Sequence, residues 1–135
     1  MNIQTFQVND LGVNCYLLWD TSSAEAALID CGAQTQSEWE RIRGFIEQKR
    51  LSLKYALLTH CHFDHVGGVG VLQEMGAKVY CSAQEKPLVN TDADLFEMFG
   101  APRVTYKVDE TFADEEVKIL NGISVKALVT AGHTA

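Results

Sequence analysis

Three of the four histidines in this sequence lie in one short segment, Thr59 to His65, which reads THCHFDH. His60 and His62 are separated by a single residue, and Asp64 and His65 follow directly. In an extended segment alternate side chains point the same way, with Cα atoms about 6.6 to 6.8 Å apart, so these two imidazoles can converge on one ion. The segment predicts a metal site, and one short loop can supply ligands to two adjacent ions.

The types of ligand indicate which metals suit the site. Imidazole and carboxylate groups favour zinc, and also iron or manganese, over a softer metal. Cys61 lies between the two histidines in sequence, and the alternation of an extended chain turns its side chain away from theirs. We expect Cys61 to be a packing residue, with metal ligation as the alternative. The four cysteines form no CxxC pair and are expected to be buried, reduced thiols of a cytoplasmic protein.

Two further features near this segment have both a functional and a plain structural interpretation. Gly67 and Gly68 let the start of the next helix approach the metal loop closely, or merely permit the helix to begin there. Asp30, at the end of a predicted strand, is an acceptor for the N–H of a ligating imidazole, or an ordinary turn residue.

The pattern of apolar residues predicts the elements that position the histidines. Strands are expected at residues 3–8, 13–19, 26–29, 54–58, 77–81, 104–108, 117–120 and 123–130, and helices at 37–50 and 66–75, with one or two short helices broken at Pro87 within 83–99. Asn121-Gly122 between the last two strands is a strong hairpin signal. The strand at 54–58 runs into the histidines and a helix follows, so the site is expected at the carboxyl end of a strand.

Composition and charge bound the function. A length of 135 residues, 47% of them hydrophobic, predicts one folded domain spanning 1–135. The net charge of −7 has no compensating basic run, so nucleic acid and anionic membranes are not expected as partners. The N-terminus lacks the features of a signal peptide, and no apolar stretch is long enough to span a membrane.

The segment THCHFDH resembles the HxHxDH signature of the metallo-β-lactamase superfamily, and TAGHT near residue 133 resembles a later histidine loop of that family. The resemblance implies an α/β (α+β) fold: the N-terminal half of an αββα sandwich, with a mixed β-sheet and helices on one face. It also implies that His60, His62 and His133 hold a first metal, while Asp64 and His65 belong to a second. Zinc, as one or two ions, is the implied cofactor.

The same resemblance implies a reaction. An HxHxDH segment followed by a GHT loop is most similar to the glyoxalase II (hydroxyacylglutathione hydrolase) branch, which implies hydrolysis of a small-molecule thioester. A bound metal lowers the pKa of water from about 15.7 to about 7 and so supplies hydroxide at neutral pH. Asp64 is then expected to be catalytic, orienting the nucleophile as well as ligating.

The family pattern also requires a bridging aspartate and another histidine after His133. We therefore expect a truncated chain, the first half of a longer fold, which is inactive alone. An exposed sheet edge would favour association, including of copies of the chain. The alternative function is a catalytically incompetent metal-binding fragment or subunit that needs a partner chain.

Overall fold

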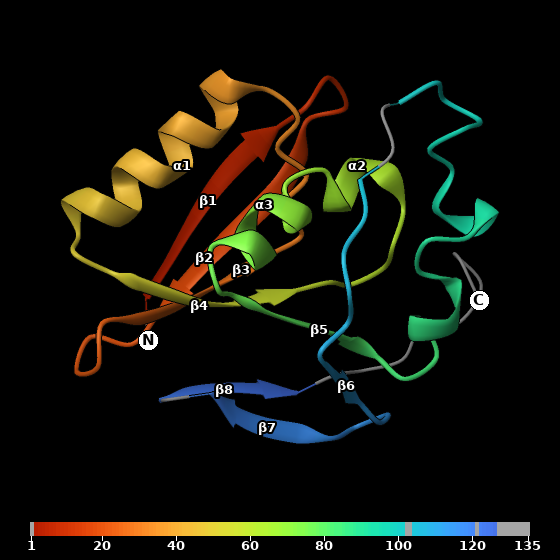
Figure 1. The fold of residues 1–135 in the computed structure, drawn as a ribbon. Coiled ribbons are helices and arrows are strands. Elements are labelled where there is room, and N and C mark those ends of the chain that lie inside the picture. Colours follow the sequence, from red (N-terminus) through yellow and green to blue (C-terminus); the bar gives the residue numbers. More distant parts are fainter. Residues whose placement is uncertain (1, 102–103, 121, 127–135) are drawn as a thin grey trace.

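The computed structural model describes residues 2–101, 104–120 and 122–126. Helices lie over one face of a six-stranded sheet, and a two-stranded sheet lies on the opposite side (Figure 1). This arrangement confirms the predicted mixed sheet with helices on one face. The elements in chain order are β1 (Asn2–Val8), β2 (Val13–Trp19), β3 (Glu25–Ile29), α1 (Gln36–Gln48), β4 (Ser52–Leu57), α2 (Phe63–Val66), α3 (Val69–Glu74), β5 (Lys78–Ser82), the 3₁₀ helices η1 (Lys86–Leu88) and η2 (Asp92–Asp94), β6 (Glu110–Phe112), β7 (Val117–Leu120) and β8 (Ile123–Lys126).

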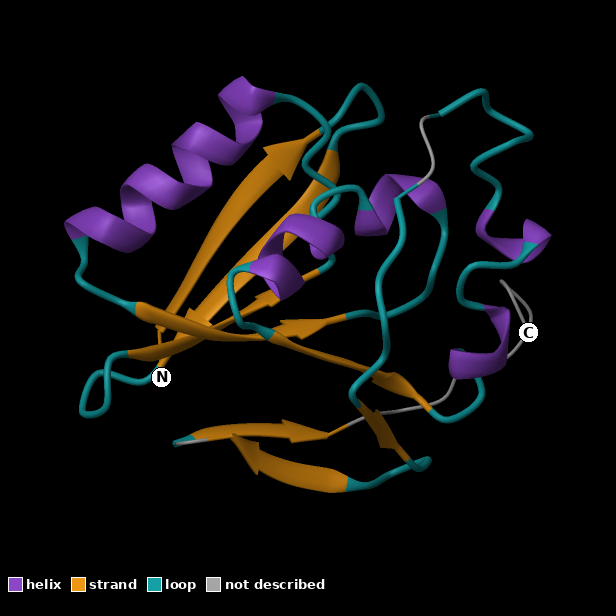
Figure 2. Cartoon of the chain, in the orientation of Figure 1, coloured by secondary structure: helices purple, strands orange, loops and turns teal. Residues whose placement is uncertain are grey.

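The six-stranded sheet changes from antiparallel to parallel pairing at β3. The first three predicted strands, β1, β2 and β3, form an antiparallel meander, with Val8 opposite Val13 at the first turn. Strands β3, β4, β5 and β6 are parallel neighbours in that order (Figure 2). The carboxyl ends of β3 and β4 therefore meet at one edge of the sheet, where open α/β sheets place their sites.

Helix α1 packs on one face of the sheet through a stripe of apolar side chains. A capping box begins the helix: the Thr35 hydroxyl accepts a hydrogen bond from the Glu38 N–H, and the Glu38 carboxylate accepts one from the Thr35 N–H. Ile42 is fully buried against the sheet, and the ring of Phe45 packs edge-on against Phe6. Burial of this stripe holds α1 on the sheet, because a helix of 13 residues is marginal by itself.

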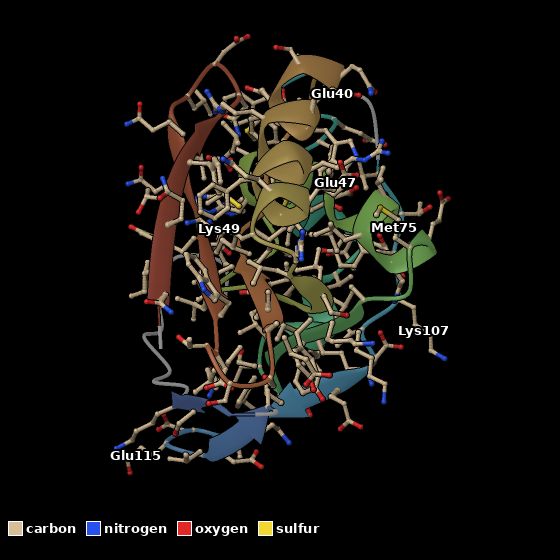
Figure 3. The ribbon with its side chains drawn as sticks, turned by 90° about the vertical axis from the view of Figure 1, so that its left-hand side faces the viewer. Glu40, Glu47, Lys49, Met75, Lys107 and Glu115 are labelled. Atoms are coloured by element: carbon tan, nitrogen blue, oxygen red, sulfur yellow. The ribbon has the colours of Figure 1, made fainter. Side chains whose placement is uncertain are left out.

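Two apolar clusters pack against the two faces of the sheet. The larger lies under the helices and includes Leu17, Leu28 and Leu72. The smaller lies between the two sheets, where Leu120 and Ile123 of the β7–β8 hairpin meet Tyr80. Figure 3 shows this hairpin at the bottom of the view, beside Glu115 and below α1. Leu120 pairs with Ile123 across the turn, which confirms the hairpin predicted from Asn121-Gly122.

Three predicted elements differ from the structure. The helix expected at 66–75 is two short helices, α2 and α3, separated by Gly67 and Gly68. Pro87 does not separate two helices but lies inside η1, at an early position where its missing N–H costs nothing. The strand expected at 123–130 is described only as far as Lys126, and residues 127–130 lie outside the described part of the chain.

The strand predicted at 104–108 is wrong, since the strand in this part of the chain is β6 at Glu110–Phe112. The side-chain amide of Gln73 forms hydrogen bonds with the backbone of Lys107 in this range. Its Oε1 accepts from the Lys107 N–H at 2.8 Å, and its Nε2 donates to the Lys107 carbonyl at 2.6 Å. A backbone satisfied by a side chain does not need a strand ladder.

None of the described helices is long and apolar enough to cross a membrane.

Candidate metal centre

The histidine segment follows β4 and leads into α2, as its position in the sequence predicts. Leu57 ends β4, and Leu58 still hydrogen-bonds to the carbonyl of Tyr80, beside the sheet. His62 precedes the first turn of α2 with φ −59° and ψ 145°, an extended backbone conformation. The chain therefore changes from extended to helical within the segment, which brings Asp64 back toward His60 and His62.

One set of side chains in the described ranges has the geometry of metal ligands. His60, His62 and Asp64 each offer one ligand atom, and these atoms all lie within 4.8 Å of one another. The rings of His60 and His62 meet edge-on with centroids 4.9 Å apart. All three residues are half-buried. Two imidazoles and a carboxylate at this separation fit a zinc ion, and equally iron or manganese.

His65 lies against this group but is held by another residue. Its ring centroid is 4.0 Å from that of His60, and its Nε2 is 3.6 Å from Oδ2 of Asp64. Its Nδ1 is 3.1 Å from Oδ2 of Asp30. Partial burial alone would lower the pKa of His65, but the hydrogen bond to Asp30, with the nearby charges of Asp30 and Asp64, raises it above its ordinary value. His133, the remaining predicted ligand, lies outside the described residues.

Asp30 orients two of the histidines at once. Its Oδ1 accepts from the Thr59 N–H at 2.8 Å, and its Oδ2 accepts from the Thr59 hydroxyl at 2.6 Å. The Thr59 oxygen in turn lies 3.0 Å from Nδ1 of His60. Asp30 therefore acts on His65 directly and on His60 through Thr59, so the Nε2 atoms of both rings are the ones left for a metal. The structure favours the acceptor interpretation of Asp30 over an ordinary turn residue.

The turn after β3 packs tightly against the metal loop. Asp30 has a positive φ of 56°, which reverses the chain at the strand end. At Gly32, an added Cβ would lie 1.9 Å from the carbonyl oxygen of Asp64, so any other residue would displace the metal loop. Gly67 and Gly68 also need to be small, because a Cβ at Gly68 would lie 2.8 Å from Sγ of Cys31. These two glycines approach the turn at 31–33, whereas the predicted approach was to the metal loop itself.

Cys61 does not belong to the ligand group formed by the described residues, in keeping with the prediction of a packing residue. It is fully buried, and the charge of Glu85 acts on its thiol. Burial, followed by the charge of Glu85, raises the pKa of Cys61 to about 12. A protonated thiol that faces the interior does not favour metal ligation.

Two residues for which the sequence predicted no role, Thr59 and Asn9, contact the site. The hydroxyl of Thr59 directly precedes the first histidine, and this adjacency was a usable signal. Asn9 donates from Nδ2 to the carbonyl of Asp64 at 2.7 Å. Asn9 and Asp64 are 55 positions apart in the sequence, which hides that contact from any local pattern.

Comparison with known proteins agrees with this geometry. The family model of the metallo-beta-lactamase superfamily matches residues 8–135. The chain therefore belongs to the metallo-β-lactamase superfamily. The predicted resemblance is confirmed over nearly the whole length.

Two curated relatives are named as different enzymes. Hydroxyacylglutathione hydrolase GloC of Haemophilus influenzae is 34% identical over 138 residues, which cover 99% of this chain and 63% of GloC. The mitochondrial persulfide dioxygenase ETHE1 of Mus musculus is 45% identical over 60 residues, covering 44% of this chain and 22% of ETHE1. The chain thus spans less than two thirds of each relative.

A solved structure shows the same fold. The BLEG-1 B3 metallo-beta-lactamase superposes with a TM-score of 0.78 at 22% identity, covering 93% of this chain and 59% of that protein. At this identity the likeness establishes the fold and does not bear on the substrate.

Proposed function

We propose that this chain carries the first part of the active site of a metal-dependent hydrolase of the glyoxalase II type, which cleaves a small thioester such as a hydroxyacylglutathione. The observation that carries the proposal is the convergence of His60, His62 and Asp64 beyond β4, with Asp30 and Thr59 orienting the imidazoles. The 34% identity to GloC over almost the whole chain supports the substrate class.

The residues have separate tasks in this proposal. His60, His62 and Asp64 hold zinc, with iron or manganese as alternative metals, and His65 and His133 complete a site for one or two ions. When bound, the metal supplies Lewis acidity and an acidified water. Asp64 both ligates and accepts a hydrogen bond that orients the nucleophile. Asp30 and Thr59 keep the Nδ1 atoms of His65 and His60 turned away from the metal.

The 63% coverage of GloC supports a second part of the proposal. Further ligands, the substrate pocket and full activity come from polypeptide beyond this domain of residues 1–135, either continuing the fold or supplied by a partner chain. The gain of activity from this further polypeptide distinguishes the proposed enzyme from the alternative, a catalytically incompetent metal-binding subunit.

The test is hydrolysis of a hydroxyacylglutathione by the zinc-loaded protein, followed by trapping of the released thiol. The protein is assayed alone and mixed with a polypeptide equivalent to the C-terminal part of GloC. Hydrolysis that appears on mixing, and that is lost in His62→Ala, is the expected result. A well-folded mixture that binds zinc but releases no thiol would favour the incompetent subunit.

One observation favours a second candidate function. Over 60 residues the identity to the persulfide dioxygenase ETHE1 reaches 45%, higher than that to GloC. In that case the site holds iron and oxidises a persulfide with molecular oxygen. Oxygen consumption by the iron-loaded mixture with glutathione persulfide, without thioester hydrolysis by the zinc-loaded one, would select this candidate.

A further inference from the structure

Asn9 connects the turn between β1 and β2 to the backbone of a candidate metal ligand. Its Nδ2 donates to two carbonyl oxygens, that of Asp64 at 2.7 Å and that of Gly32 at 3.2 Å. The side chain therefore bridges the metal loop and the turn after β3, the two segments whose contact forms the site.

The side-chain amide of Asn9 is held in this orientation by its own turn. Asn9 has a positive φ of 51°, a conformation that asparagine tolerates better than most residues. Its Oδ1 accepts from the Leu11 N–H at 2.9 Å, and its backbone N–H donates to the Glu38 carboxylate. With Oδ1 engaged by Leu11, the NH₂ group faces the two carbonyls.

The carbonyl of Asp64 needs such a donor because α2 is interrupted. In a continuous α-helix this carbonyl would accept from the N–H of Gly68, four residues later. The Gly68 N–H instead donates to the carbonyl of Cys31 at 2.8 Å. Asn9 supplies the replacement donor, and the absence of a side chain on Gly32 makes room for the Asp64 oxygen.

We propose that Asn9 is a positioning residue for the metal ligand Asp64. By fixing the Asp64 peptide within a helix of only four residues, it sets the direction in which the carboxylate leaves the backbone. This inference rests on the proposed function in one respect, namely that Asp64 is a ligand.

The experiment compares Asn9→Gly with Asn90→Gly. Glycine retains the positive φ at both positions and removes only the side-chain amide. Asn90 is a matched control, since it has a φ of 61° and donates to the carbonyl of Tyr106 at 2.9 Å. Zinc affinity is measured by competition with a chromogenic chelator, and ligand geometry by the visible absorption of the cobalt-substituted protein.

The expected result is an approximately tenfold loss of zinc affinity and an altered cobalt spectrum in Asn9→Gly, with neither change in Asn90→Gly. Asn9→Asp is a second variant, in which oxygen atoms face both carbonyls, and it should weaken binding at least as much. If both Asn9 variants keep wild-type affinity and spectrum, the positioning role is overturned while the metal site stands. A wild-type protein that binds no metal would instead overturn the site on which the proposed function depends.

Discussion

At the scale of single residues, Asp30 joins two parts of the candidate site, Thr59 and His65. Asp30 has a relative exposure of 5%, and both of its carboxylate oxygens accept hydrogen bonds. Burial of a carboxylate is costly unless the carboxylate is hydrogen-bonded. Here the hydrogen-bond partners are Thr59, which adjoins His60, and His65. The cost of burying Asp30 is thereby offset by contacts that fix two imidazole rings.

Replacing Asp30 with asparagine should weaken zinc binding by about ten- to a hundredfold. The amide retains the size of the side chain but presents an N–H toward Thr59 or His65, where the carboxylate only accepts. Chelator competition measures the affinity. Asp20→Asn is the control, because Asp20 accepts from the Ser23 N–H in a turn after β2 and should leave affinity unchanged. Equal affinities in the two variants would refute the role of Asp30.

Thr59→Val tests the hydroxyl alone. Valine retains the shape of threonine but removes the group that links Asp30 to Nδ1 of His60. We expect about a tenfold loss of zinc affinity, whereas Thr59→Ser should retain wild-type binding. The same chelator competition reads out both variants, and a valine variant that binds zinc as tightly as the wild type would show that the hydroxyl does not contribute.

At the scale of elements, the contact between the turn after β3 and the metal loop sets the geometry of the site. Gly32→Ala places a Cβ 1.9 Å from the carbonyl of Asp64 and should cost roughly 1–3 kcal/mol of unfolding free energy. Gly44→Ala, on α1 with open space around it, should instead add roughly 0.5–1 kcal/mol. Urea denaturation of both variants measures the difference, and an unaffected Gly32→Ala protein would contradict the close packing.

Helix α1 should give the protein an acid-sensitive component of stability. Burial alone would raise the pKa of Glu38, but hydrogen bonds from the N–H groups of Gln34, Asn9 and Thr35 lower it below 4.5. A lowered folded pKa stabilises the protein above pH 4.5, and this contribution is lost as the pH falls through the folded value.

Glu38→Gln should therefore unfold at a midpoint less dependent on pH below 4.5 than the wild type does. Thermal unfolding measured across that range is the readout. A Glu38→Gln protein with unchanged pH dependence would mean that the capping contacts do not persist in solution.

The sequence predicted those elements whose signals are local. The meander, α1, β4, β5 and the hairpin follow from apolar periodicity and turn residues, and THCHFDH indicated the ligands directly. The strand at 104–108 was wrong, and within that range the backbone of Lys107 is hydrogen-bonded by the side chain of Gln73, more than thirty residues earlier. Asp30 was one of two open interpretations from sequence, and its contact with Thr59, 29 positions away, decides for the acceptor role. The role of Asn9 depends on a contact across 55 positions, which composition and spacing do not show.

At the scale of the whole molecule, the two faces of the sheet have different tasks. The helical face and its core hold the turns at the ends of β3 and β4 together, while the hairpin β7–β8 covers part of the other face. The site thus lies beyond the carboxyl ends of the central strands β3 and β4, where the chain enters α2 (Figure 1). The metal ligands should be preorganised by this scaffold before any metal binds.

The most direct test of the central claim is elemental analysis of metal per chain, by mass spectrometry, on wild type and His62→Ala protein dialysed against zinc and then against buffer. We predict about one zinc ion per wild-type chain, held by His60, His62 and Asp64, and none in the variant, since the loss of one of three ligands opens the site. Zinc retained equally by both proteins, or by neither, would contradict the assignment of this segment as a metal centre.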